Sequence, residues 1–267
     1  MKYYVAVADI HGEIDKLNQA LERCQLWISH NIMSDDTVQF IFLGDLCDRG
    51  PDSNAVIAKV KEYVEAGAIL CMGNHDMFLI GTAESDDKMI RIWGYNGGLE
   101  TCLQMFGEVP TTATDAVKNF SYVREMGAGY AILNYSEVIK NSWQYKFYKE
   151  HATLYHETDG IFFCHAPQSD VKEELTAWNL TWGRQSDYDS SEDGIFKVPN
   201  NKRMSVHGHY HRLRQGQNFP RIRNYVHGGI AKTVVLADSG CGCADFGRLK
   251  AIIIRENGKY PEIEAIL

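Results

Sequence analysis

Short apolar runs alternate with helix-spaced apolar stripes along the first part of the chain. The runs at 3–8, 38–43 and 68–72 are rich in β-forming residues and predict three buried strands. The stripes at 14–24 and 51–66 recur at helical spacing and predict two amphipathic helices between those strands. Strands that alternate with helices predict a parallel sheet, so we expect an α/β fold.

The rest of the chain carries further strand signals and one long helical region. Residues 84–157 read mainly as helix and loop. Apolar, β-rich runs predict more strands at 161–164, 204–206, 233–237 and 249–255. No repeat, low-complexity tract or linker rich in Pro, Gly or Ser divides the sequence. A chain of 267 residues is close to the upper limit for one hydrophobic core, so we expect a single domain spanning 1–267.

Polar clusters follow the predicted strands where those strands end. In chain order they read Asp9-Ile10-His11-Gly12, Gly44-Asp45-Leu46-Cys47-Asp48-Arg49-Gly50-Pro51, Gly73-Asn74-His75-Asp76, His165, Trp182-Gly183-Arg184 and Gly208-His209-Tyr210-His211. Ligands of open α/β sheets gather outside the carboxyl ends of strands, which is where the first three clusters begin. Together the clusters offer carboxylate, imidazole and amide ligands for two metal ions, and guanidinium groups for a phosphate.

The first two clusters are interpreted from the donor atoms they carry. Asp9 and His11 lie two residues apart, so an extended backbone would point both side chains toward one ion. Taken alone, this pair is better explained by an ordinary turn. Asp45 has two oxygens and can bridge two cations, whereas Asp48 is better placed to orient a neighbouring group. Arg49 offers a fork of N–H donors that matches a phosphate.

The third cluster supplies a candidate general acid. Asn74 can give a neutral oxygen to a metal ion. His75 titrates near neutral pH and can protonate a leaving oxygen. Either Asp48 or Asp76 could hold its imidazole in the protonated form.

The remaining clusters are weaker signals when each is taken alone. A single histidine at a strand end, such as His165, is more often structural than a ligand. His209 and His211 lie two apart, and His207 shares their alternation, so the choice of ligand stays open. Arg184 offers a second guanidinium for a phosphate, although a surface arginine is an equally good interpretation.

Composition narrows the classes of partner. The net charge of −8 and the pI near 5.7 disfavour general nucleic-acid binding, because an acidic surface repels phosphate backbones. No apolar run approaches the ~20 residues that span a bilayer, and the run before Asp9 is too short for a signal core, so no membrane is expected. The seven cysteines are odd in number and irregularly spaced, which predicts a reduced, cytoplasmic protein.

The motifs resemble the metal-dependent phosphoprotein phosphatase family, within the calcineurin-like metallophosphoesterases. The matching motifs are Asp9-x-His11-Gly12, Gly44-Asp45-x-x-Asp48-Arg49-Gly50, Gly73-Asn74-His75-Asp76, His165-Ala166 and Gly208-His209. The resemblance covers about 3–255 and is greatest to the small bacterial and phage-type serine/threonine phosphatases. The segments from Asn96-Gly97-Gly98 through Thr101, Trp182-Gly183-Arg184 and Asp238-Ser239-Gly240-Cys241 are also similar to that branch. The resemblance implies a central β-sandwich flanked by helices, in four α/β/β/α layers.

The resemblance also implies roles for individual residues. The first metal ion would take Asp9, His11 and Asp45, and the second would take Asp45, Asn74, His165 and His209. His75 would be the general acid paired with Asp48, and Arg49 and Arg184 would hold the phosphate. His211 matches a further ligand found in the wider superfamily, whereas this position is usually not histidine in the phosphoprotein branch. The implied cofactor is two divalent ions, with Mn²⁺ favoured and Fe or Zn²⁺ also compatible.

The expected reaction is direct hydrolysis of a phosphate monoester by a water that bridges the two ions. The leading expectation is a serine/threonine protein phosphatase, active also on tyrosine, whose partner is a phosphorylated protein or a small phosphate ester. The first alternative is a hydrolase of dinucleoside polyphosphates such as diadenosine tetraphosphate.

Two further alternatives come from other classes. A phosphodiesterase or nuclease would need a basic groove, for which the only candidate is the stretch Arg212, Arg214, Arg221 and Arg223. A non-catalytic metal-binding scaffold would have no need of His75, Asp48 and Arg49.

Overall fold

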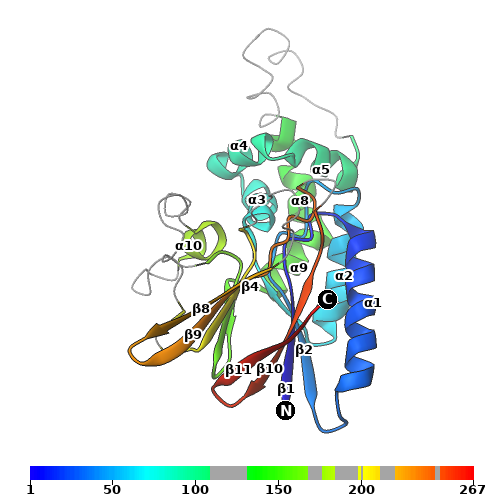
Figure 1. Ribbon diagram of the computed structural model, residues 1–267. Helices are drawn as coiled ribbons and strands as arrows, with labels where there is room; N and C mark the ends of the chain where they lie inside the picture. The colour runs from blue at the N-terminus through cyan, green and yellow to red at the C-terminus, as the bar shows by residue number, and fades with distance from the viewer. Residues whose placement is uncertain (109–130, 168–175, 184–197, 200, 211–219, 244–246) are drawn as a thin grey trace.

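Two β-sheets lie face to face at the centre of the molecule, with helices outside them (Figure 1). The computed structural model describes residues 1–108, 131–167, 176–183, 198–199, 201–210, 220–243 and 247–267. Arg184, His211, Arg212, Arg214 and the acidic stretch 187–193 lie outside these ranges.

The first sheet contains the parallel strands predicted from the start of the chain. In spatial order its strands are β11 (Tyr260–Ile266), β10 (Ala251–Asn257), β1 (Lys2–Val7), β2 (Thr37–Phe42), β3 (Ile69–Cys71) and β4 (Ala152–Thr153). β1, β2, β3 and β4 run parallel, and β10 and β11 are antiparallel to their neighbours. The predicted parallel arrangement is therefore confirmed.

The second sheet is built from the C-terminal part of the chain. In spatial order its strands are β5 (Tyr155–Glu157), β6 (Ile161–Cys164), β7 (Met204–His207), β9 (Ile230–Leu236) and β8 (Arg221–His227). β6, β7 and β9 are parallel, so the carboxyl ends of β6 and β7 share one edge of the sheet.

The described helices pack mainly against the outer face of the first sheet. They are α1 (Ile14–Asn31), α2 (Ser53–Glu65), α3 (Asn74–Ala83), α4 (Asp87–Tyr95), α5 (Gly98–Phe106), α8 (Ser136–Asn141), α9 (Trp143–His151) and α10 (Ala177–Trp182). In Figure 1, α1 and α2 lie along that face, while α10 lies beside the second sheet. Leu180 of α10 packs on Phe162 and Cys164, which covers the outer face of the second sheet.

The alternation of side chains along β1 explains the layers. Val5 and Val7 face the helices, whereas Tyr4 and Ala6 face the second sheet. Tyr4 meets Phe163 of β6 across the sandwich, with ring centroids 5.6 Å apart. Each such fully buried apolar side chain contributes about 1.5–3 kcal/mol. The structure thus has an apolar layer on both faces of the first sheet, and the expected fold class, two sheets flanked by helices, is confirmed.

Several predicted boundaries were wrong, each for a physical reason. The first helix continues to Asn31, because exposed residues such as Leu26, with 62% of its surface accessible, weakened the apolar stripe beyond Cys24. β8 and β11 were missed because both are edge strands in which half-buried and exposed positions alternate. The helical region predicted at 84–157 ends in the two short strands β4 and β5.

No described helix is long and apolar enough to cross a membrane. All seven cysteines are free thiols, and six of them are buried. The single domain over 1–267 stays a prediction.

Candidate metal centre and phosphate site

The polar clusters meet at the carboxyl ends of β1, β2, β3, β6 and β7, around one cavity of about 170 Å³. The cavity is lined by Asp9, His11, Asp45, Arg49, Asn74, His75, Asn96, Trp182, His209, Tyr210 and Asp238. Of the other residues predicted for the site, His165 and Asp48 are fully buried beside this cavity and contact its lining. Arg184 and His211 lie outside the described residues.

Asp45 lies between two histidines that come from different sheets. Its Oδ2 is 3.6 Å from His11 Nε2 and 3.5 Å from His165 Nε2. Its Oδ1 accepts a hydrogen bond of 2.9 Å from the His75 backbone N–H, which fixes the carboxylate. Two groups of residues could each hold a metal ion: His11, Asp45 and His75, and Asp45, His165 and His209. Within each group the ligand atoms lie within 4.8 Å of one another. Because both groups share Asp45, the carboxylate is in the position of a bridging ligand.

Backbone carbonyls orient the two histidines. Nδ1 of His11 donates to the Cys47 carbonyl at 2.9 Å, and Nδ1 of His165 donates to the Leu43 carbonyl at 2.6 Å. In a neutral imidazole this leaves the lone pair on Nε2, on the side of Asp45. His165 Nε2 also lies 3.0 Å from Asn74 Oδ1. Amide oxygen, carboxylate oxygen and imidazole nitrogen therefore converge as acceptors, an arrangement that fits a cation.

Buried carboxylates lie close enough together in the cavity to repel one another when they are ionised. Burial, then Asp238 and Asp45, raise the pKa of Asp9 well above its usual range. Burial also opposes ionisation of Asp45, but His165 and His75 outweigh it and lower the pKa of that carboxyl. Bound divalent ions would remove the repulsion between these carboxylates.

Burial favours the neutral form of His11 and His209, which is the form that binds metals. Burial and, after it, the neighbouring His165 lower the pKa of His209 to about 3. Burial likewise lowers the pKa of His11 well below its usual range. His207, which shared the alternation with His209, does not line the cavity, and its Nδ1 lies 3.3 Å from Cys164 Sγ.

The backbone of the cavity differs from the extended geometry that the spacing of Asp9 and His11 had suggested. β1 ends at Val7, and Asp9 and His11 have φ values of 50° and 48°. Left-handed φ values also occur at Asp45, Asp48, Arg49 and His209. Such conformations cost about 1–3 kcal/mol each for residues other than glycine and are found together at functional sites.

Two motif glycines allow carboxylates to approach the backbone closely. A Cβ on Gly208 would lie 2.2 Å from Asp9 Oδ2, and a Cβ on Gly73 would lie 2.2 Å from Asp45 Oδ1. The N–H that follows Gly208, that of His209, donates to both oxygens of Asp9 at 3.0 and 2.9 Å. Both motifs therefore depend on glycine for packing against a candidate ligand.

His75 is paired with Asp48 rather than with Asp76. Its Nδ1 donates to Asp48 Oδ2 at 2.5 Å. Asp48 is fully buried and also accepts from Trp93 Nε1, at 2.9 Å to each oxygen, and from the Thr101 hydroxyl. Burial alone would lower the pKa of His75, but Asp45 and Asp48 outweigh it and raise that pKa. The imidazole is thus held ready to carry a proton on the cavity side.

Sequence reasoning missed Trp93 and assigned no role to Thr101, although Thr101 ends a segment that resembles the phosphatase branch. The available signal was their position on either side of the motif Asn96-Gly97-Gly98, which reads as a break between helices. Asp76, the other predicted candidate, fixes the loops instead. It accepts from the backbone N–H groups of Asp45 and Gly73 at 2.8 and 2.9 Å.

Arg49 extends its guanidinium over the two histidines of the first sheet. Nη1 lies 2.8 Å from His11 Nε2, and Nη2 lies 3.2 Å from His75 Nε2. Nη1 also donates to Cys243 Sγ at 2.7 Å, a contact that the sequence did not indicate. The guanidinium therefore faces the cavity, where it could bind an anionic group.

Aromatic side chains close the cavity on the side of the second sheet, among them Trp182 at the end of α10. Trp182 lines it and meets His209 edge-on, with ring centroids 6.2 Å apart. The arginines of β8, which were candidates for a basic groove, are placed elsewhere. Arg221 lies over the ring of Tyr210 and Arg223 over that of Tyr225, and neither arginine lines the cavity.

The family model for calcineurin-like phosphoesterases matches residues 3–213. This chain belongs to the calcineurin-like phosphoesterase family. Membership confirms the expected class of enzyme, a metal-dependent hydrolase of phosphate esters, and the resemblance inferred from the motifs. The serine/threonine branch within this family stays a prediction.

Similar proteins include the symmetrical bis(5'-nucleosyl)-tetraphosphatase of Dechloromonas aromatica (strain RCB), which is 37% identical over 90 residues. That match covers 31% of this phosphoesterase chain and 27% of the relative. The chain spans less than a third of the length of the curated relatives it matches.

Solved structures share the fold over nearly the whole chain. A protein provisionally named a diadenosine tetraphosphatase has a TM-score of 0.51 at 15% identity, covering 98% of this chain and 92% of its own. A hypothetical protein from Pyrococcus horikoshii OT3 has a TM-score of 0.51 at 12% identity, covering 99% and 87%. At these identities the likeness shows the fold alone.

Proposed function

We propose that this phosphoesterase uses a dinuclear metal centre to hydrolyse phosphate monoesters by direct attack of water. The observation that carries the proposal is the position of Asp45 Oδ2 between His11 Nε2 and His165 Nε2, at 3.6 and 3.5 Å. A carboxylate oxygen flanked by two imidazole nitrogens is suited to bridge two cations.

The proposed ligands fall into two sets that share Asp45. One ion would be held by Asp9, His11 and Asp45, and the other by Asp45, Asn74, His165 and His209. Two divalent ions supply Lewis acidity, a water of lowered pKa and a clamp for phosphate oxygens. Mixed oxygen and nitrogen ligands suit Mn²⁺, which we favour, and also Fe and Zn²⁺. His211 remains a proposed additional ligand.

The protein's own groups would complete the reaction around the phosphate. Arg49 would bind phosphate oxygens and neutralise their charge, with Arg184 proposed as a second cationic group. His75 would carry a proton on Nε2 and give it to the leaving oxygen, while Asp48 holds Nδ1. General acid catalysis of this kind contributes about 10²–10⁴-fold.

The Asp48–His75 pair favours a substrate with a poor leaving group. An alcohol leaves as a strongly basic alkoxide unless it is protonated, so a fully buried carboxylate that keeps the imidazole charged is of most use for such a substrate. Phosphoserine and phosphothreonine in proteins fit this chemistry, and phosphotyrosine fits less well because a phenol leaves more easily. A phosphorylated protein is therefore the leading proposed substrate. We also propose that the enzyme is cytoplasmic.

A dinucleoside polyphosphate is the second candidate substrate. Support comes from curated relatives that are named symmetrical bis(5'-nucleosyl)-tetraphosphatases. A nucleoside diphosphate is a good leaving group, so His75 would contribute less to that reaction. Nucleic acids are not proposed as substrates, because the protein has a net charge of −8.

The test is a comparison of kcat/KM on a phosphoserine peptide and on diadenosine tetraphosphate, in wild type and in His75→Asn with Mn²⁺ added. We expect the peptide to be the better substrate and to lose about 10²–10⁴-fold in the variant. Preference for diadenosine tetraphosphate, with a much smaller loss in the variant, would support the second candidate. Absence of turnover on both, and on p-nitrophenyl phosphate with any divalent metal, would refute the proposed activity.

A further inference from the structure

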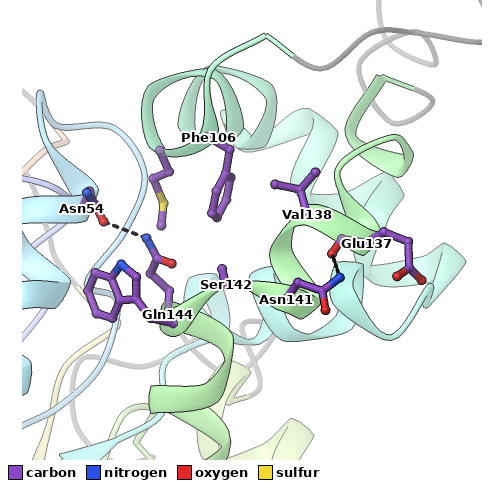
Figure 2. A pocket seen from close by; sticks show the side chains of 9 residues that line it. Asn54, Phe106, Glu137, Val138, Asn141, Ser142 and Gln144 are labelled. Carbon is purple, nitrogen blue, oxygen red and sulfur yellow. Dashed lines mark hydrogen bonds between the residues drawn. The ribbon is translucent and has the colours of Figure 1, made fainter.

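Two cavities differ in what their walls offer a ligand. The larger, of about 550 Å³, lies between α2, α5, α8 and α9. Its one charged residue among those described is Glu137, and Figure 2 shows that carboxylate turned away from the interior. The catalytic cavity, by contrast, is lined mainly by charged and polar side chains. One of them, Asp238, belongs to neither proposed set of metal ligands.

The second sheet brings Asp238 to the catalytic cavity. The residue follows β9, which is parallel to β7, and the Ala237 N–H donates to the His207 carbonyl at 2.6 Å where these two strands end. Only 6% of the Asp238 surface is exposed. Strand pairing therefore places a buried carboxylate at the edge of the sheet where the other site residues meet.

Asp238 is held in place by the turn that it begins. Its Oδ1 accepts a hydrogen bond of 2.8 Å from the Gly240 N–H. Gly240 has a φ of 76°, a left-handed value that favours glycine, and it forms a β-bridge with Arg248. The Cys243 N–H donates to the Gly240 carbonyl at 3.1 Å. The Asp238 carboxylate is therefore a fixed part of the cavity wall.

Asp9, the neighbouring carboxylate, is fixed as well. The His209 N–H donates to both of its oxygens, at 3.0 and 2.9 Å, and Gly208 packs against its Oδ2. Of the charged neighbours of Asp9, Asp238 has the largest effect and raises the pKa of that carboxyl. Arg49 and the His209 N–H oppose this effect without cancelling it. The fold thus keeps two buried carboxylates close together where the first ion is proposed to bind.

The charges of the proposed metal centre favour a further carboxylate. Two divalent ions carry four positive charges, whereas their proposed ligands include only two carboxylates, Asp9 and Asp45. Arg49 adds a positive charge to the same cavity. A third carboxylate reduces this excess, and it does so most strongly for the nearest ion, because the interaction between charges falls with distance. The nearest ion is the one proposed beside Asp9.

We propose that Asp238 raises the affinity of the first metal ion, the one beside Asp9, through its negative charge and without being a ligand. This inference rests on the proposed dinuclear centre. It gives a role to the motif Asp238-Ser239-Gly240-Cys241, which neither ligand set includes. The repulsion between Asp238 and Asp9 is the source of the effect, because binding of the first ion relieves it.

The test is a titration of the full-length protein with Mn²⁺. The electron paramagnetic resonance signal of free Mn²⁺ gives the bound amount without any turnover. The wild type should bind two ions per chain. Asp238→Asn should also bind two, but the Kd of one ion should rise about tenfold while the other Kd changes by less than about threefold. In His209→Ala, which should keep the first ion, Asp238→Asn should again raise the Kd about tenfold.

Two comparisons separate charge from a structural role. Asparagine keeps the shape of aspartate and an Oδ1 that can accept from the Gly240 N–H, so the turn is retained. Asp35→Asn removes the same charge from an exposed residue that precedes β2 and does not line the cavity, and it should leave both Kd values unchanged. In urea denaturation without metal, Asp238→Asn should be at least as stable as the wild type, because it relieves the repulsion with Asp9.

Several results would overturn the inference. These are unchanged Kd values in folded Asp238→Asn, an equal effect of Asp35→Asn, or a variant that is less stable without metal and loses both ions equally. A rise of more than about 100-fold would make Asp238 a ligand instead. If Asp238→Asn does not fold, Asp238→Ser decides in its place, because its hydroxyl can also accept from the Gly240 N–H. A wild type that does not bind two Mn²⁺ ions would refute the proposed metal centre itself, so the two failures are distinguishable.

Discussion

The two sheets contribute to the catalytic cavity in different ways. The loops after β1 and β2 are joined to each other through their backbones: the N–H groups of Ile10 and His11 both donate to the Asp45 carbonyl, at 3.0 and 2.9 Å. The second sheet is joined to these loops through side chains. The His165 ring donates to the Leu43 carbonyl, and the His209 N–H donates to the Asp9 carboxylate. The first sheet therefore supplies a rigid framework, and the second sheet adds histidines that complete it.

The strongest test of this difference compares a candidate ligand from each sheet. Asp45→Asn removes the shared carboxylate, so we expect loss of both metal ions and a decrease in kcat/KM of more than about 10³-fold. His209→Ala removes a ligand of one proposed ion only, and the protein should keep about one metal per chain. Metal content by mass spectrometry and kcat/KM on p-nitrophenyl phosphate measure both effects. Equal metal loss in the two variants would show that the sheets do not differ in this way.

A second prediction concerns the proton donor of the first sheet. His75→Asn should lower kcat on a phosphoserine peptide by about 10²–10⁴-fold while metal content stays near that of the wild type. The reason is that His75 Nδ1 is taken by Asp48, and the residue is proposed to act through a proton rather than as a ligand. Loss of metal in parallel with activity would make His75 a ligand instead, as its place beside His11 and Asp45 would allow.

The two sheets also differ in how well their site residues could be predicted from the sequence. Asp45 and His75 follow predicted strands in longer motifs, and Asp9 follows the first predicted strand, so their convergence at one sheet edge could be predicted. His165 and His209 gave weak local signals, because a strand end with one histidine is common. Their convergence depends on the pairing of β6 with β7, which links positions about forty residues apart.

Other features could not have been read from the sequence at all. The left-handed backbone at Asp9 and His11 follows from the loop contacts after β1 rather than from the spacing of the two residues. Trp93 and Thr101 reach Asp48 from α4 and α5, and only tertiary packing brings those helices to that carboxylate. The edge strands β8 and β11 were missed because half-exposed strands lack a continuous apolar run.

A third prediction concerns how activity depends on pH, which reports on the charged groups around His75. Asp48 and Asp45 raise the pKa of His75 against the effect of burial, and the protonated ring is the proposed acid. Activity should therefore fall as the pH rises through that pKa. Asp48→Asn removes one negative charge, so the alkaline limb of the kcat profile should move to lower pH by about one unit. An alkaline limb that stays in place would assign it to another group.

The smallest predicted effect is at Thr101. Thr101→Val keeps the shape of the side chain and removes its hydroxyl donor to Asp48, which leaves two hydrogen bonds from Trp93 in place. We expect a loss of about 1–3 kcal/mol in the free energy of unfolding. Urea denaturation measures it. Ser29→Ala, an exposed hydroxyl on α1, serves as the control and should change stability by less than about 0.5 kcal/mol.

The central claim is that one carboxylate, Asp45, joins two metal ions, one held by loops of the first sheet and the other completed by histidines of the second sheet. Anomalous diffraction from crystals of the Mn²⁺-loaded protein tests it directly. The account predicts two manganese peaks about 3.5–4 Å apart, one beside His11 and the other beside His165, with Asp45 bound to both. A single peak, or two peaks that do not share Asp45, would contradict it.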